Sequence, residues 1–311
     1  MPRVAALFAL MGALMLDTLG VGVVASGLSA SKLHEERGWT LYSKLTEERQ
    51  DVWATSEVGG VRLAYAAGFS WLRAEASLPS IMGMDNSQLL DSAQCREAVS
   101  LMRDVAEAAV GAGLPPLEEW RVSRFDPCWS WASDPSLYLA ALVAGRLPRT
   151  QPVHYGSSVL YKTRSGRTRA RAYDKAAEQG HSVELPLRVE RQVRRREVVK
   201  VEGLKVGRSV EDALSERVCF SILRETLSAL GFDRPVPSIG QTRALLVGAL
   251  GKRVGRNSWA LLRDVVDGGG VWPSDVSKWS RRKYERGWRE AGVSAVSLDG
   301  ELPPLELPSV G

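Results

Sequence analysis

The chain has 311 residues, of which 44% are hydrophobic and 25% charged, and its formal net charge is +5. A chain of this length and ordinary composition can bury a core, as one large domain or two. Its cysteines (Cys95, Cys128 and Cys219) are odd in number and lack metal-ligand spacing, which indicates a reducing compartment and no disulfide framework. Only three histidines occur, far apart in sequence, and this excludes a paired-histidine metal motif.

The positive charge is concentrated in the middle of the chain. Residues 121–210 hold 18 Lys and Arg against 8 Asp and Glu, a net charge of +10, whereas residues 1–120 hold 9 against 15, a net charge of −6. A polyanion, above all a nucleic acid, is the natural partner of such a block. The alternative is a basic face that is simply solvated.

The first residues are apolar. Between Val4 and Ser31 the only charge is Asp17, and a 13-residue apolar run follows Arg3. Three interpretations stay open: an N-terminal extension over residues 1–13 with Met11 or Met15 as the true start, a membrane-associating segment, or a cleaved signal. We favour the extension and expect no stable membrane association, because the run is shorter than the roughly 20 residues that span a bilayer.

We expect a core over residues 14–231, in two halves. In the first half, residues 14–116, a strand over LDTLGVGVV is followed by a polar, irregular stretch over 32–60 and a hairpin over 61–66 and 69–78. A helix opened by Asn86 or Ser87 then ends at Gly111. The pair Pro115-Pro116 separates the halves.

The second half, residues 117–231, repeats this order with different lengths. We expect a strand over 118–131, a short helix capped by Ser133 or Asp134, a hairpin over 159–163 and 167–174, a strand over 185–194, and a helix over 209–230. The segments LRAEASL (72–78) and LRVERQV (187–193) both place Arg and Glu two residues apart. They suggest a duplication, which so short a match leaves open.

The predicted fold class is therefore α+β: an antiparallel sheet from a β-β-α type unit, whose duplication stays open, with helices on one face, plus a small helical C-terminal region over 232–298. The last helix, over 275–291, gathers Lys278, Arg281 and Arg282 near one face. That pattern suits either phosphate binding or an ordinary amphipathic helix. Residues 299–311, rich in proline, are expected to form a disordered tail.

Strand parity brings a tyrosine, carboxylates and cations to one face, because alternate side chains of a strand point the same way. Arg124 shares a face with Asp126, and Arg188 shares one with Glu190. Residues 169, 171, 173 and 175 share another, whereas Asp174 points to the opposite side of its strand and is expected to be structural. If these strands are neighbours, the face holds what a phosphodiester cleavage through a covalent tyrosine intermediate needs.

Five segments, MLDTLGVGV, LRAEASLPSIMGMDN, WRVSRFDPCWSW, RARAYDKAAE and LPLRVERQVRR, resemble the successive blocks of filamentous-phage and related plasmid rolling-circle replication initiators. The resemblance implies a cytoplasmic endonuclease of a bacterial host that nicks one strand at the double-strand origin and later rejoins the displaced strand. Tyr173 would be the nucleophile, leaving a 5′-phosphotyrosine and a free 3′-OH. Tyr155 and Tyr161 lie near it in sequence and stay open as alternatives.

The chemistry of the residues fits that activity. A phenol needs a nearby cation or metal to react as phenolate at neutral pH, which Lys175 or Arg171 can supply. Asp126 and Glu190 are hard oxygen ligands suited to Mg²⁺ or Mn²⁺, and Glu178 is either a further ligand or a helix-start carboxylate. The predicted phosphate clamps are Arg124 and Arg188, and the predicted DNA-binding residues are Arg169, Arg171, Arg194, Arg195, Arg196, Lys278, Arg281 and Arg282.

The expected partners are double-stranded origin DNA and single-stranded DNA, with a host helicase and a second copy of the chain as further candidates. Two other readings compete with the nickase. The first is a non-catalytic DNA-binding protein with the same fold, which needs the basic surface but not the tyrosine. The second is a membrane-associated protein whose basic block faces anionic lipid. A structural alternative for the Arg and Glu residues is cross-strand ion pairing on an exposed sheet face.

Overall fold

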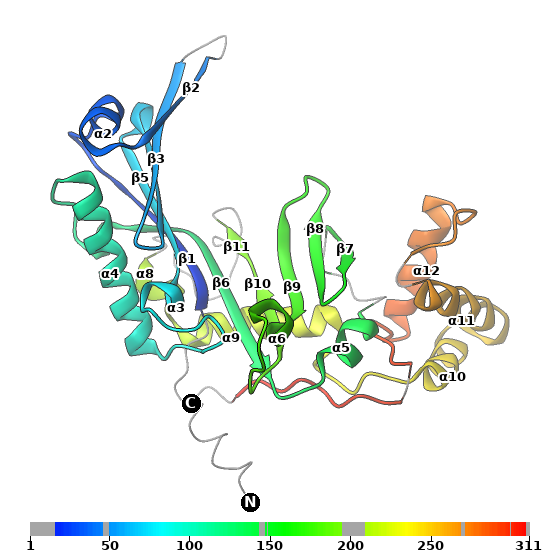
Figure 1. Ribbon diagram of the computed structural model, residues 1–311. Helices are drawn as coiled ribbons and strands as arrows, with labels where there is room; N and C mark the ends of the chain where they lie inside the picture. Colours follow the sequence, from blue (N-terminus) through cyan, green and yellow to red (C-terminus); the bar gives the residue numbers. More distant parts are fainter. Residues whose placement is uncertain are drawn as a thin grey trace, which may run out of the picture. The chain divides into compact units, whose positions relative to one another are not determined.

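The computed structural model describes residues 16–45, 50–142, 147, 149–194, 209–268, 271–298 and 300–308 (Figure 1). The chain divides into two compact units. The first contains the described residues of Met1–Cys128 and Gln192–Ile222, and the second those of Trp129–Arg191 and Leu223–Ser309. The predicted N-terminal extension (1–13) and two predicted DNA-binding residues, Arg195 and Arg196, lie outside the described residues.

The first unit is a sheet with helices packed on one face. Its strands run in the order β2-β3-β4-β5-β1-β6, each antiparallel to its neighbour, and β11 pairs with β6. The elements are β1 (Leu16–Val24), α2 (Ala30–Arg37), β2 (Thr40–Leu45), β3 (Gln50–Val58), β4 (Val61–Ala66), β5 (Trp71–Ser77), α3 (Leu78–Ile81), α4 (Ser92–Val110), most of β6 (Arg121–Trp131), β11 (Val193–Arg194), α8 (Val210–Ala213) and the start of α9 (Glu216–Leu230).

Register gives this sheet an apolar and a polar face. Leu19 of β1 pairs with Ala76 of β5, and both belong to a core cluster that also contains Met102 of α4. The next pair, Gly20 and Glu75, faces the other way. Burial of the apolar face therefore leaves charged side chains of β4, β5 and β6 on the polar face.

The second unit has the same two-faced design. Its strands lie in the order β10-β9-β8-β7, and β6, whose last residues belong to this unit, lies next to β10. The elements are α5 (Pro135–Ala141), β7 (Thr150–Tyr155), β8 (Ser158–Thr163), β9 (Thr168–Asp174), α6 (Lys175–Gln179), β10 (Leu187–Arg191), the rest of α9, α10 (Ile239–Leu250), α11 (Lys252–Asp267) and α12 (Lys278–Glu290). The apolar face packs Val159, Ala172 and Val189 with Leu227 of α9.

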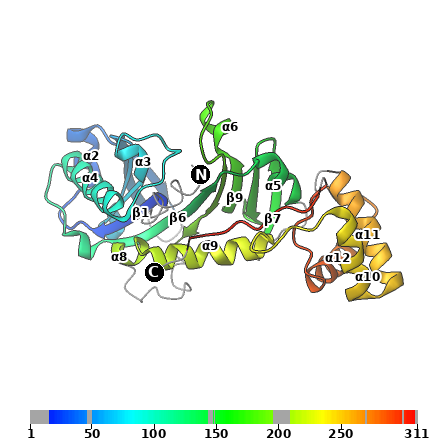
Figure 2. The ribbon, with the colours of Figure 1, turned by 90° about the horizontal axis from the view of Figure 1, so that it is seen from below.

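Helices α10, α11 and α12 gather into one bundle (Figure 2). They share a core of their own, which includes Leu246, Leu262 and Trp288. Gly255 is required at the crossing of α10 and α11, because a Cβ there would lie 2.5 Å from the carbonyl oxygen of Leu246. The predicted helical C-terminal region is thus a close-packed bundle within the second unit.

The α+β fold class is confirmed, and so are most predicted strands. The stretch over 32–60 is not irregular, however, since it forms α2, β2 and β3. β2 is an edge strand whose side chains over residues 40–44 are all exposed. Its sequence therefore lacks the alternation of buried apolar and exposed polar residues that predicts a strand. The helix expected from Asn86 begins at Ser92, because Asp91 and Gln94 form a capping box there.

Two expectations near the C-terminus differ from the structure. The helix over 209–230 is two helices, α8 and α9, and Ser209 caps the first of them. The segment 300–308, expected to lie in a disordered tail, packs on the second unit: Leu302 pairs with Val236, and the Leu305 amide donates to the Phe232 carbonyl at 2.8 Å. Two buried leucines in this segment outweigh its proline content.

The order of elements repeats along the chain. Each half consists of a strand, a helix, four further strands and a later helix: β1, α2, β2 to β5 and α4 in the first half, and β6, α5, β7 to β10 and α9 in the second. The strand orders β1-β5-β4-β3-β2 and β6-β10-β9-β8-β7 also correspond. The repeated unit is therefore larger than the β-β-α unit expected from the sequence.

Candidate active site

Tyr173 lies on the polar face of the second unit, near the end of β9. It pairs across the sheet with Arg188 of β10 on one side and with Ser158 of β8 on the other. Only 2% of the residue is exposed. Its neighbours therefore decide what its hydroxyl can do.

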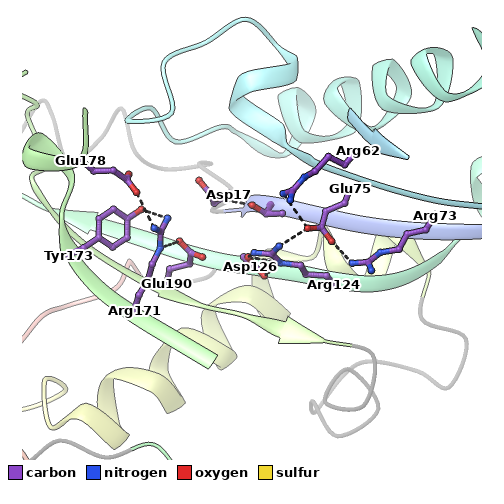
Figure 3. A network of polar contacts seen from close by, with 11 residues as sticks. Asp17, Arg62, Arg73, Glu75, Arg124, Asp126, Arg171, Tyr173, Glu178 and Glu190 are labelled. Carbon is purple, nitrogen blue, oxygen red and sulfur yellow. Dashed lines mark hydrogen bonds and ion pairs between the residues drawn. The ribbon is translucent and has the colours of Figure 1, made fainter. Parts of the chain in front are cut away.

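Arg171 links that tyrosine to two carboxylates (Figure 3). Its Nη2 donates to the Tyr173 hydroxyl at 3.1 Å, its Nε to Glu190 at 2.7 Å and its Nη1 to Glu178 at 3.0 Å. The guanidinium carbon lies 4.0 Å from the centroid of the Tyr173 ring. We call these residues and Lys175 the Tyr173 cluster (Arg171, Tyr173, Lys175, Glu178 and Glu190).

Lys175 is fully buried at the start of α6. Its ammonium donates to Glu178 at 2.5 Å and lies 5.6 Å from the Tyr173 ring centroid. Asp174 accepts hydrogen bonds from the amides of Ala176 and Ala177 and so caps α6, which agrees with the structural role expected from its parity. The cap fixes α6, and with it Lys175 and Glu178, beside the tyrosine.

The electrostatics of this cluster favour charged forms. Burial lowers the pKa of Arg171, but Glu190, Tyr173 and Glu178 raise it by more, so the guanidinium stays charged. Burial raises the pKa of Glu178, but Lys175 and Arg171 lower it by more, to a net value below its usual range. A fixed positive charge therefore lies beside the phenol oxygen, where it stabilises negative charge developing on that atom.

The predicted phosphate clamp Arg188 is buried. It is 1% exposed, and its Nε donates to Ser130 of β6 at 2.8 Å. Arg169, a predicted DNA-binding residue, is half-buried on β9, and its carbonyl accepts from Arg191 at 3.1 Å. These two arginines support the sheet around the cluster rather than present a free cation.

The two alternative tyrosines differ sharply in environment. Tyr161 lies in the apolar core with no exposed area, on the face opposite Tyr173, which argues against it as a nucleophile. Tyr155 is 50% exposed and pairs with Ser158, so that it shares a cross-strand row with Tyr173. Its hydroxyl accepts from Lys162 at 3.0 Å. Tyr155 is therefore the alternative that an experiment must test.

Arg124 and Asp126, which were expected beside Tyr173, belong to the first unit. Arg124 donates from Nε to both carboxylate oxygens of Asp126, at 3.0 and 2.9 Å, and from Nη1 to Glu75 at 2.6 Å. Glu75 also pairs with Arg73 and, at 3.4 Å, with Arg62. We call this set, with Arg194 opposite Arg124, the Glu75 cluster (Arg62, Arg73, Glu75, Arg124, Asp126 and Arg194). The cross-strand ion pairing weighed from the sequence does occur here.

The predicted metal ligands do not form a metal site in this structure. Asp126 accepts from Arg124, Glu190 from Arg171, and Glu178 from Lys175 and Arg171. Within the described residues, no group of three or more His, Cys, Asp or Glu side chains is placed to hold an ion. Because these carboxylates already neutralise cations, Mg²⁺ or Mn²⁺ would have to compete with an arginine or a lysine for each of them.

The predicted DNA-binding residues of α12 differ in availability. Lys278 and Arg282 are exposed, whereas Arg281 pairs with Glu285 at 3.0 Å and lies 4.9 Å from the Trp272 ring centroid. Trp279 of the same helix is 73% exposed and has the Lys283 ammonium 5.8 Å from its ring centroid. Spacing of three and four residues places it on one helix face with residues 282, 283 and 286.

The cysteines offer no competing nucleophile. All three are free and buried, and burial raises the pKa of Cys95 to about 12. In the part of the chain described here, no helix is both long and apolar enough to cross a bilayer.

No family model matches the chain, and a search of curated proteins finds no match either. One solved structure to which it is similar is a rolling-circle replication initiator protein from Geobacillus stearothermophilus. The two share 13% sequence identity over 60% of this chain and 76% of that chain, with a TM-score of 0.31. A likeness at this TM-score does not indicate a function for this chain.

Proposed function

We propose that the chain is a rolling-circle replication initiator that nicks one DNA strand through a covalent tyrosine intermediate. The observation that carries the proposal is the Arg171–Tyr173 contact: a charged guanidinium donates to the phenol oxygen and covers the ring, on a polar sheet face. The segment order described from the sequence supports the same activity. A tyrosine with a purely structural role would not require the four ion-paired neighbours that surround Tyr173.

In the proposed reaction the Tyr173 oxygen attacks phosphorus and loses its proton, and the bond from phosphorus to the 3′-oxygen breaks. The products are a 5′-phosphotyrosine and a 3′-OH, which takes up a proton and primes synthesis. Attack of a 3′-OH on the phosphotyrosine reverses the step and rejoins the strand. Arg171 stabilises the phenolate oxygen, and Lys175 adds a second positive charge beside it.

DNA would be held by exposed cations outside the Tyr173 cluster. Lys278 and Arg282 of α12 flank Trp279, and single-stranded DNA binds to surfaces that combine cations with stacked aromatic rings. Recruitment of a host helicase, self-association and dependence on Mg²⁺ or Mn²⁺ stay predictions from the sequence. The same holds for a bacterial cytoplasmic location.

A non-catalytic DNA-binding protein is the second candidate. The observation that favours it is the burial of Tyr173, since a nucleophile has to reach a phosphate. The two candidates differ in one product, a covalent protein–DNA adduct.

The test uses purified full-length protein and supercoiled DNA that carries the origin of its own replicon. Reactions with Mg²⁺, with Mn²⁺ and with a chelator are resolved on denaturing gels, and any adduct is mapped. We expect an adduct on a 5′-phosphate that is absent in Tyr173→Phe and retained in Tyr155→Phe. An adduct lost only in Tyr155→Phe would move the nucleophile. Salt-sensitive binding without an adduct under every condition would establish the non-catalytic candidate instead.

A further inference from the structure

The two clusters occupy corresponding strands in the same register. In the first half, Arg62 of β4 pairs with Glu75 of β5; in the second, Arg171 of β9 pairs with Glu190 of β10. The corresponding ion pairs are 3.4 and 2.7 Å long. Because β4 and β9 hold the same place in the repeated strand order, the Glu75 cluster is the counterpart of the Tyr173 cluster.

The nucleophile position differs between the two copies. In the second half Tyr173 pairs with Arg188, the arginine two residues before Glu190. In the first half the corresponding residue is Ala64, which pairs with Arg73, two residues before Glu75. The first copy also has Ala66 where the second has Lys175, so it retains the arginines and the glutamate of the paired strands but neither the nucleophile nor the lysine.

The charges of the Glu75 cluster, which β6 and β11 complete, are unbalanced. The Glu75 cluster has four arginines and two carboxylates, so that it carries a net positive charge on a sheet face. Glu75 alone is contacted by Arg62, Arg73 and Arg124. We propose that this cluster binds a backbone phosphate of DNA, as a silent copy of the nicking site.

Two features make the cluster accessible to a phosphate. The side chains of Arg62 and Arg73 are 63% and 38% exposed, whereas that of Glu75 is 11% exposed, so the guanidinium groups form the outer layer. The Nε of Arg73 has no hydrogen-bond partner in the described part of the chain, and because this atom is buried, a phosphate would reach it only after the side chain shifts. Guanidinium groups held on a carboxylate lose little freedom when they bind a phosphate.

The crowding of cations favours an added anion. Burial and the charge of Arg124 lower the pKa of Arg194, whose partner across β6 and β11 is Arg124 itself. A phosphate near these groups would relieve this repulsion. In contrast, the Tyr173 cluster pairs two cations with two carboxylates and has no comparable excess.

This proposal rests on the proposed function for its ligand, DNA, but its test needs no cleavage. Binding of the full-length protein to fluorescently labelled duplex and single-stranded oligonucleotides is measured by anisotropy over a salt series. The variants are Arg62→Gln and Arg73→Gln. The matched control is Arg96→Gln, which removes one charge from an exposed arginine of α4 that pairs with Glu211 at 3.7 Å.

We expect each cluster variant to bind DNA roughly tenfold more weakly, with a salt dependence smaller by about one phosphate contact. The control should bind like the unmodified protein, and melting curves should show all three variants folded. A loss on duplex only, or on single strands only, identifies the strand form that the cluster holds. Cluster variants that bind both forms as Arg96→Gln does would overturn the proposal.

The two proposals fail separately. If DNA binding depends on Arg62 and Arg73 but no adduct forms, the phosphate site is supported and the nicking activity is contradicted. If an adduct forms at Tyr173 but neither arginine variant changes DNA binding, the nicking activity is supported and the phosphate site is contradicted.

Discussion

The guanidinium of Arg171 lies 4.0 Å from the ring centroid of Tyr173 and donates to its hydroxyl at 3.1 Å. The same group donates to Glu190 and Glu178, so each of its nitrogen atoms has an acceptor. Planarity is what allows one side chain to stack on the ring and reach three acceptors at once.

Arg171→Lys should therefore impair the reaction although it keeps the charge. An ammonium cannot cover the ring and also reach the hydroxyl and both carboxylates. We expect adduct formation to slow by about 100-fold or more, the usual effect of removing one donor to a developing negative charge. Single-turnover cleavage of a labelled origin oligonucleotide measures this. A rate within threefold of the unmodified protein would contradict the role given to Arg171.

Glu178→Gln should strengthen DNA binding. The carboxylate neutralises Lys175 and Arg171, and a phosphate entering the cluster would have to compete with it. Removing its charge frees Lys175 and leaves Arg171 with Glu190 as its one carboxylate partner in the cluster, so we expect a several-fold lower Kd and a steeper salt dependence. Anisotropy with a single-stranded oligonucleotide measures both. Weaker binding in this variant would show that Glu178 supports DNA binding instead of opposing it.

Trp279→Ala should weaken single-stranded DNA binding, because the ring is exposed beside cations and stacking contributes about 1 to 3 kcal/mol per base. Trp279→Phe keeps an aromatic face and should retain most of the affinity. Duplex binding, in which the bases are already stacked, should change little. Equal losses on both DNA forms would indicate a packing role for the ring.

Asp126→Ala should destabilise the first unit. The carboxylate is fully buried and holds Arg124, and breaking a buried pair from one side costs about 3 to 5 kcal/mol. Asp267→Ala removes an exposed partner of Arg263, 4.0 Å away, and should cost less than about 1 kcal/mol. Urea unfolding compares the two variants. Equal costs would show that Asp126 is not held as the geometry indicates.

The stabilising effect of Glu75 should depend on pH. Burial raises the pKa of this carboxyl, but Arg124, Arg73 and Arg62 lower it by more, so in the folded protein it lies below the usual 4.5. A lowered pKa contributes stability above the unfolded value, and that stability is lost as the pH falls through the folded value. The melting temperature of Glu75→Gln should therefore lie below that of the unmodified protein at about pH 7, with the gap closing below about pH 4. A gap that is constant with pH would rule out the charge of Glu75 as its cause.

The sequence by itself determined which side chains share a strand face. Parity placed Arg171 with Tyr173 and put Asp174 on the other side, and both placements hold because side chains alternate in any strand. The predicted cap at Asp134 likewise marks where α5 begins, although the cap expected at Asn86 or Ser87 was wrong for α4. Such features are local, and a short window of residues contains all the information they need.

Only the tertiary structure decided which strands are neighbours and hence which charges meet. That Arg171 reaches Glu190, that Glu75 gathers three arginines, and that Ala64 stands where the second half has Tyr173 all depend on pairing and register between distant segments. Burial is decided in the same way. The side chain of Arg188 could bind a phosphate, but the packing of β6 beside β10 buries it against Ser130. Its access to solvent depends on these neighbouring strands, which the local sequence does not specify.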